Sequence, residues 1–180
     1  MTLESPRFRP LLALEALARH HVDYVLIGGL AATLHGSPLT TGDADICPDP
    51  TPDNLVRLVA ALRELDARVY APDSPRGLKF DIAPETLVQA QIWNLVTEAG
   101  RVDISWLPSG TRGYPDLVQD ALAYELDDIV VMVASLADVI RSKEAAGRER
   151  DRAALPTLRL LLERAEKQQP LAESLVAPRF

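Results

Sequence analysis

The sequence YVLIGGLAATLHGSPLTTGDADIC occupies residues 24–47. Residues 23–27, apolar after Asp23, predict a buried strand, and residues 29–35, with several small side chains, predict a short helix at the Gly28-Gly29 turn. Residues 35–42 are rich in turn-forming types and predict a loop. Residues 43–47 predict a second strand, so the stretch indicates strand, turn, helix, loop and strand in that order.

Two aspartates open the second predicted strand. Asp43 and Asp45 are separated by one residue, and side chains at i and i+2 of a strand point to the same face, roughly 6.6 Å apart along the chain. Two carboxylates on one face repel each other unless a cation lies between them. Mg²⁺ or Mn²⁺ suits such a pair, because these ions prefer oxygen ligands and keep contact with substrate phosphates.

The glycine pair predicts the second half of a site. Gly28 and Gly29 allow a polyphosphate to approach the backbone, and the free N–H groups at a helix start favour an anion. Strand, Gly-Gly and helix also occur together as a plain turn, so the prediction rests on their conjunction with the aspartate pair. No Walker A motif is present, which excludes P-loop chemistry.

A third carboxylate is predicted from a later hairpin. Residues 91–98 and 101–106 predict two strands joined by a tight turn. Asp103 alternates with Val102 and Ile104, so it faces away from the apolar side and could complete a metal site. The alternatives are that Asp103 is a solvated strand residue, or that Asp81 is the third carboxylate.

A lysine is predicted to point inward near the C-terminus. The helix after Ser135 carries an apolar stripe of Leu136, Val139 and Ile140, and Lys143 lies on that stripe. A lysine rarely buries without a partner, and aspartates with a triphosphate would provide one. The alternative is a lysine at the helix end whose amine extends into solvent.

The pattern GG…TGDAD, with GRVDISWLPSG at 100–110 and VIRSKEAAGRERDRAAL at 139–155, resembles the minimal nucleotidyltransferases of the DNA polymerase beta-like superfamily. The similarity is strongest to AbiEii/MenT-type toxins of toxin–antitoxin pairs and spans about residues 22–162. The family commonly has an arginine near position 39, where this chain has Leu39.

The resemblance implies a role for each candidate residue. Catalytic residues would be Asp43, Asp45, Asp103 and Lys143, the three aspartates also being the metal ligands. Nucleotide-binding residues would be Gly28, Gly29, Thr41, Lys143, Arg148 and Asp151. His35 is interpreted as a packing or capping residue rather than a catalytic one.

The expected fold class is α/β (α+β): a small mixed β-sheet with helices packed against one face, nucleotidyltransferase-like, plus C-terminal helices. Residues 1–134 would form the core and residues 135–180 a helical part packed on the same domain, with its last helix after Pro156. The pattern predicts further helices at 10–20, 52–62 and 114–121, an edge strand at 67–70, an irregular segment at 72–84 and a hairpin at 124–133.

Composition limits the possible functions. The 180 residues carry a net charge of −7, which argues against general DNA binding, and one cysteine, which fits a reducing cytoplasm. No apolar run is long enough for a membrane span.

The expected activity is metal-dependent transfer of NMP from an NTP to an acceptor hydroxyl, with release of pyrophosphate. The resemblance implies a toxin that modifies the tRNA 3′ end and is neutralised by an antitoxin protein. Two alternatives stay open: an enzyme that nucleotidylates (AMPylates) a partner protein, and a degenerate member that binds without catalysis.

Overall fold

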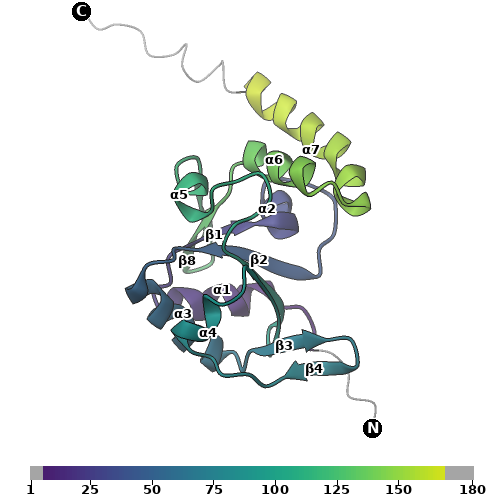
Figure 1. The fold of residues 1–180 in the computed structure, drawn as a ribbon. Helices are drawn as coiled ribbons and strands as arrows, with labels where there is room; N and C mark the ends of the chain where they lie inside the picture. The colour runs from purple at the N-terminus through teal and green to yellow at the C-terminus, as the bar shows by residue number, and fades with distance from the viewer. Residues whose placement is uncertain (1–5, 169–180) are drawn as a thin grey trace, which may run out of the picture.

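The computed structural model describes residues 6–168, which fold around one eight-stranded sheet (Figure 1). Its strands are β1 (Tyr24–Ile27), β2 (Asp43–Pro48), β3 (Arg68–Ala71), β4 (Ser74–Leu78), β5 (Ile92–Thr97), β6 (Gly100–Ser105), β7 (Leu122–Leu126) and β8 (Ile129–Val133). They lie in the order β4-β3-β5-β6-β2-β1-β8-β7. The pairs β2/β6 and β1/β8 are parallel and the other pairs are antiparallel, so the sheet is mixed.

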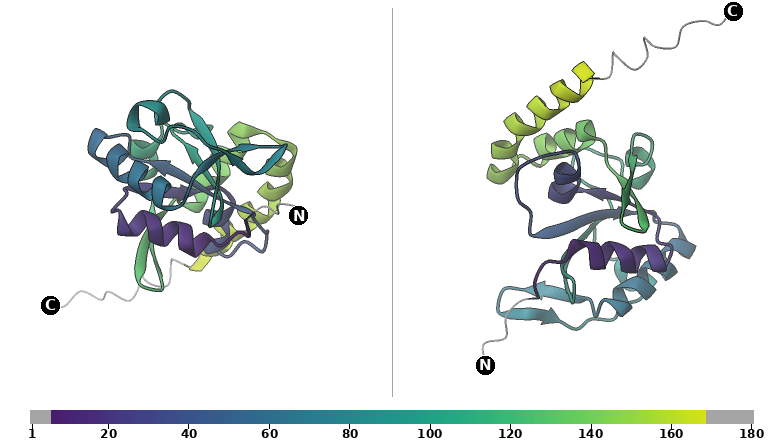
Figure 2. Two further views of the ribbon diagram at one scale, coloured as in Figure 1. Left: turned by 90° about the horizontal axis from the view of Figure 1, so that it is seen from below. Right: turned by 180° about the vertical axis from the view of Figure 1, so that it is seen from behind.

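Helices cover both sides of the sheet. They are α1 (Pro10–Arg19), α2 (Gly28–Leu34), α3 (Pro52–Glu64), α4 (Pro84–Leu87), α5 (Tyr114–Leu117), α6 (Leu136–Ala146) and α7 (Glu149–Gln168). Helices α1, α3 and α4 lie on one side, whereas α2, α6 and α7 lie on the other (Figures 1 and 2). The site described below is on the side of α2, α6 and α7.

Strand alternation divides β2 and β6 into an apolar and a polar face. Ala44 and Ile46 of β2, with Val102 and Ile104 of β6, are almost completely buried. The intervening aspartates therefore point to the opposite face. Packing of α1 and α3 on the apolar face fixes which side of the sheet carries the carboxylates.

A buried asparagine ties the first two strands to α3. The Asn54 amide donates 2.8 Å hydrogen bonds to the carbonyls of Asp23 and Asp49, and its oxygen accepts from the Asp23 N–H at 2.8 Å. Asn54 is fully buried, and all of its side-chain polar atoms are bonded to backbone groups at the start of β1 and the end of β2. The contact holds the ends of β1 and β2 next to each other.

The α/β class, the mixed sheet and the expected strands at 43–47, 91–98 and 101–106 are confirmed. The expectation that helices cover one face is wrong, because an apolar stripe does not encode which side of the sheet it packs on. The segment 72–84 is not irregular: it contains β4, which pairs with β3 and makes β3 an interior strand. The helix at 114–121 is reduced to the single turn α5.

The last helix begins before Pro156 rather than after it. Helix α7 starts at Glu149 and contains Pro156, although proline removes one backbone hydrogen bond. Burial of Ala154, Leu155 and Leu158 against the core on both sides of the proline offsets that loss.

Helices α6 and α7 contribute to the same apolar core as the sheet, through Leu136, Val139, Ile140 and Leu158 among others. The division at residue 134 stays a prediction, and residues 169–180 lie outside the described part. Among residues 6–168, no helix has both the length and the hydropathy needed to cross a lipid bilayer.

Replacing Asn54 tests the link between β1, β2 and α3. We expect Asn54→Ala to lower the free energy of unfolding by about 2–3 kcal/mol, because it removes three part-buried hydrogen bonds that join β1, β2 and α3. Val56→Ala, at an exposed position of the same helix, is the matched control and should change stability by less than about 0.5 kcal/mol. Urea unfolding measures both, and equal effects would contradict the role of Asn54.

Candidate active site

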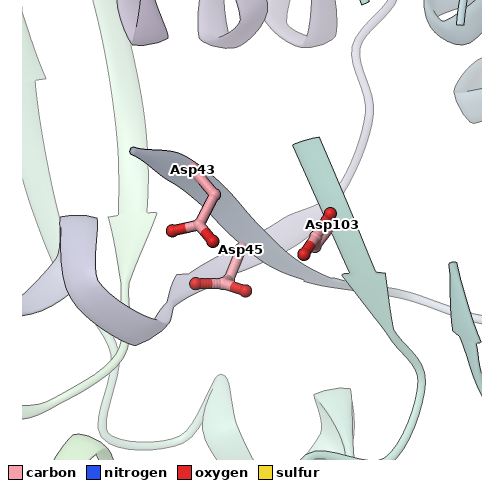
Figure 3. A group of neighbouring side chains, drawn as sticks. All are labelled: Asp43, Asp45 and Asp103. Atoms are coloured by element: carbon pink, nitrogen blue, oxygen red, sulfur yellow. The ribbon is translucent and has the colours of Figure 1, made fainter. Parts of the chain in front are cut away.

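Three aspartates converge at the centre of the sheet. Asp43 and Asp45 come from β2 and Asp103 from the adjacent parallel strand β6, and Figure 3 shows their side chains close together. One carboxylate oxygen from each lies within 4.8 Å of the others. The register pairs Asp45 directly with Asp103, which explains how residues far apart in sequence meet.

The Gly-Gly turn lies directly beside this cluster. Gly28 begins α2 with a positive φ of 67°, and a Cβ atom built there would lie 2.1 Å from Asp45 Oδ2. A Cβ at Gly29 would lie 2.7 Å from Thr41 Oγ1. Only glycine therefore allows the backbone of this turn to approach Asp45 and Thr41 so closely.

Thr41 holds the first aspartate in place. Its hydroxyl donates a 2.8 Å hydrogen bond to Asp43 Oδ1 and lies 3.2 Å from the Asp43 carbonyl oxygen. Thr41 thus contacts a predicted metal ligand, and it also borders the cavity beside the glycine turn. Its predicted phosphate contact stays a prediction.

The cluster is electrostatically unfavourable without a cation. Burial raises the pKa of Asp45 to about 7, with repulsion from Asp43 and Asp103 adding to the effect and Arg150 and Lys143 opposing it. Burial also raises the pKa of Asp103, against the opposing effect of Arg101. Close carboxylates raise each other's pKa in this way, and a divalent cation would relieve the repulsion.

Asp151, a buried aspartate of α7, binds two cationic side chains, Lys143 and Arg148. Asp151 accepts hydrogen bonds from Lys143 Nζ at 3.1 Å and from Arg148 Nε at 2.7 Å. Burial alone would raise the pKa of Asp151, but these hydrogen bonds outweigh it and hold the pKa below its usual value. Asp151 therefore stays ionised and fixes Lys143, which points inward as its position on the apolar stripe predicts.

One large cavity connects these groups. It has a volume of about 770 Å³ and lies between the sheet and α6–α7. Its lining includes all the predicted site residues: Gly28, Gly29, Thr41, Asp43, Asp45, Asp103, Lys143, Arg148 and Asp151. The volume is within the range of small-molecule sites, and a nucleotide would fit.

Other candidates lie elsewhere or are already engaged. Asp81 is exposed between β4 and α4 and does not belong to the carboxylate cluster. His35 uses both ring nitrogens, one 2.8 Å from the Ala134 carbonyl and one 3.0 Å from the Tyr124 hydroxyl. These contacts fit the interpretation of His35 as a packing residue. Leu39, which replaces the family's basic residue, borders the cavity and is exposed.

Two arginines near the carboxylates were not predicted. Arg101 contacts Asp103, and Arg150 borders the cavity and lowers the pKa of Asp45. The alternation that placed Asp103 on the polar face applies equally to Arg101, so a signal for it was present. Arg150 has no such signal, because the charged run 148–152 is typical of a solvated helix face.

The three carboxylates fit a hard divalent cation. All three offer oxygen donors, which Mg²⁺ and Mn²⁺ prefer, and the like charges need compensation. Asp43, Asp45 and Asp103 would hold the ion on the side of the cavity opposite Lys143 and Arg148.

Comparison with family models and with curated proteins gives no match. Among solved structures, the chain is similar to a candidate nucleotidyltransferase from Thermotoga maritima. The two share 18% identity with a TM-score of 0.47, over 94% of this chain and 96% of that chain. This likeness adds nothing about substrate or chemistry, which rest on the geometry above.

The raised pKa of Asp45 predicts a pH-dependent stability in metal-free buffer. Between about pH 4 and pH 7 the folded state keeps a proton that the unfolded state releases, so the free energy of unfolding falls as pH rises through this window. Asp45→Asn cannot titrate, so it should be more stable than the wild type at pH 8, by up to about 4 kcal/mol, with the gain vanishing near pH 4. Urea unfolding at both pH values measures the difference.

Asp81→Asn is the matched control for this prediction, because it removes an exposed carboxylate outside the cluster. Its stability relative to the wild type should change little between pH 4 and pH 8. An effect of Asp45→Asn that is the same at both pH values would contradict the proposed burial of charge.

The close approach of Gly28 to Asp45 predicts that alanine at position 28 weakens metal binding, whereas alanine at another glycine with a positive φ does not. Gly28→Ala should displace Asp45 and weaken Mn²⁺ binding at least about tenfold. It should also lower the free energy of unfolding by the roughly 1–2 kcal/mol that a positive φ costs any alanine. Gly36→Ala is the control, because Gly36 also has a positive φ but no atom lies within 4 Å of its added Cβ. Mn²⁺ titration by electron paramagnetic resonance (EPR) should separate the two, and equal affinities would contradict the prediction.

Proposed function

We propose that this protein is a metal-dependent nucleotidyltransferase that transfers NMP from an NTP to an acceptor hydroxyl. One observation carries the proposal: three carboxylates from β2 and β6 meet beside the Gly28-Gly29 turn, inside a cavity whose other side carries cations. Carboxylates, a glycine turn and cations are the groups that bind, respectively, a divalent metal, a polyphosphate backbone and phosphate charge.

The residues divide the reaction between them. Gly28 and Gly29 bind phosphate oxygens through their N–H groups, and Asp43, Asp45 and Asp103 hold Mg²⁺ or Mn²⁺. Thr41 binds a phosphate oxygen through its O–H group when the hydroxyl turns from Asp43 Oδ1, to which it donates in the structure. The bound ion supplies Lewis-acid stabilisation of charge on the phosphate oxygens. Lys143, fixed by Asp151, and Arg148 stabilise the negative charge that develops on the leaving group.

The bond changes follow from this arrangement. The acceptor oxygen attacks the α-phosphorus while Asp103 takes its proton as general base. A new bond forms between the acceptor oxygen and the α-phosphorus, and the bond to the bridging α–β oxygen breaks. Pyrophosphate leaves with that electron pair, and the acceptor carries the NMP.

The acceptor is inferred from the sequence resemblance. The resemblance favours an RNA acceptor, namely the tRNA 3′ end. It also favours a toxin that an antitoxin protein neutralises. Protein nucleotidylation is the second candidate, since the cavity is large enough for a nucleotide and its lining does not specify the acceptor. A non-catalytic binding protein is the third, and Leu39 in place of a basic residue is the observation that favours it.

Transfer of label tests the activity and the acceptor together. The wild type, with Mg²⁺ and each α-³²P-labelled NTP, should label total tRNA, and periodate oxidation of the tRNA 3′ diol should abolish labelling. A γ-labelled NTP should transfer nothing, because that phosphate leaves with pyrophosphate. Asp45→Asn should lose at least about a hundredfold in rate, whereas Asp81→Asn should not.

Each outcome separates the candidates. Label in a protein band of a whole lysate, with none in RNA, would favour protein nucleotidylation. The absence of α-label from both RNA and protein with every NTP would overturn the enzymatic proposal. Growth arrest on expression that Asp45→Ala relieves would support a toxin.

A further inference from the structure

We propose that Arg101 is a positioning residue for the metal site: held against the ring of Tyr70, it keeps the Asp103 carboxylate turned toward Asp43 and Asp45. The inference rests on the metal site of the proposed function and extends it to two residues outside the predicted set. It assigns Arg101 and Tyr70 no contact with the reacting atoms.

The strand positions place Arg101 beside the cluster. Arg101 precedes Asp103 by two residues on β6, so both side chains project from the same face. The parallel register pairs Arg101 with Asp43 on β2, in the row next to the Asp45–Asp103 pair. The register between β2 and β6 therefore places the Arg101 side chain next to the carboxylates.

The contacts of Arg101 join two neighbours. Its Nη2 lies 3.3 Å from both oxygens of Asp103, and its guanidinium carbon lies 4.1 Å from the centre of the Tyr70 ring. Within residues 6–168, its side chain makes hydrogen bonds to Asp103 alone, and the Arg101 Nε atom is buried without an acceptor. Stacking on the Tyr70 ring thus restricts the position of the Arg101 guanidinium, which bonds to the Asp103 carboxylate.

Asp103 depends on this contact. Its only other hydrogen bond from the described residues is the backbone N–H of Leu95, at a long 3.3 Å. The neighbouring carboxylates repel it, so rotation away from the cluster would relieve repulsion. Lys143 and Arg148 cannot replace Arg101, since both bond to Asp151.

Arg101 and a metal ion can share Asp103. A carboxylate has two oxygens with about four acceptor positions, so a guanidinium on one side leaves positions for a cation on the other. Hydrogen bonds to metal-ligating carboxylates orient them, and removing such outer contacts typically costs about 10–100-fold in metal affinity. The geometry therefore predicts weaker metal binding when Arg101 is lost, despite its positive charge.

Titration of the purified protein with Mn²⁺, followed by EPR of free Mn²⁺, tests the proposal without measuring activity. Arg101→Gln should weaken Mn²⁺ binding about tenfold or more. Tyr70→Ala should act in the same direction with a smaller effect, and Tyr70→Phe, which keeps the ring, should bind as the wild type does. Adding Tyr70→Ala to Arg101→Gln should have no further effect, because Tyr70 acts through Arg101.

Arg68→Gln is the matched control. Arg68 precedes Tyr70 by two residues on β3, so it projects from the same face, and it pairs with Asp66 rather than with the cluster. This variant should bind Mn²⁺ as the wild type does. Thermal melts show whether each variant folds, and if Arg101→Gln does not, the Tyr70 pair carries the test because Tyr70 is exposed.

The outcomes distinguish this inference from the proposed function. Unchanged or tighter Mn²⁺ binding by Arg101→Gln, with the wild type binding normally, overturns the positioning role alone. Equal binding by Tyr70→Ala and Tyr70→Phe overturns the part assigned to Tyr70. If the wild type binds no Mn²⁺, the proposed metal site fails and this inference fails with it.

Discussion

Repulsion among three carboxylates is the constraint on which this site depends. Asp43, Asp45 and Asp103 are brought within 4.8 Å, and burial raises the pKa of Asp45 to about 7. Such an arrangement destabilises the fold and persists only where the surrounding structure enforces it. Here the apolar faces of β2 and β6 are buried against α1 and α3, so the sheet cannot turn its acidic face away.

Neighbouring residues hold the three carboxylates in place against this repulsion. Thr41 orients Asp43, Arg101 contacts Asp103, and the Gly28 backbone closes on Asp45 where any side chain would collide. The cations of the C-terminal helices offset the repulsion only in part: Lys143 and Arg150 lower the pKa of Asp45, while Asp151 binds Lys143 and Arg148 away from the carboxylates. Separate anionic and cationic walls are what a metal-bound polyphosphate requires.

Local periodicity predicted much of this arrangement. Alternation alone placed Asp103 on the polar face, and the stripe through Leu136 and Val139 placed Lys143 inward. What could not be predicted depends on pairing between distant segments: the register that sets Asp45 against Asp103, and the turn between α6 and α7 that gives Lys143 to Asp151. The segment 72–84 was misjudged for the same reason, since β4 is defined by its partner β3 and its own Pro-Arg-Gly sequence favours a turn.

The parallel pairing of β2 with β6 also determines when the site can exist. Two of its carboxylates come from β2 and the third from β6, and the segment between these strands forms α3, β3, β4, α4 and β5. Such long-range contacts form late because their loop-closure entropy must be overcome first. A nascent chain that has emerged only through β2 would therefore carry the glycine turn and two aspartates yet remain chemically inert, and competence would arise only once synthesis has passed β6 and also the helices α6 and α7, which bring Lys143 and Arg148 to the cavity.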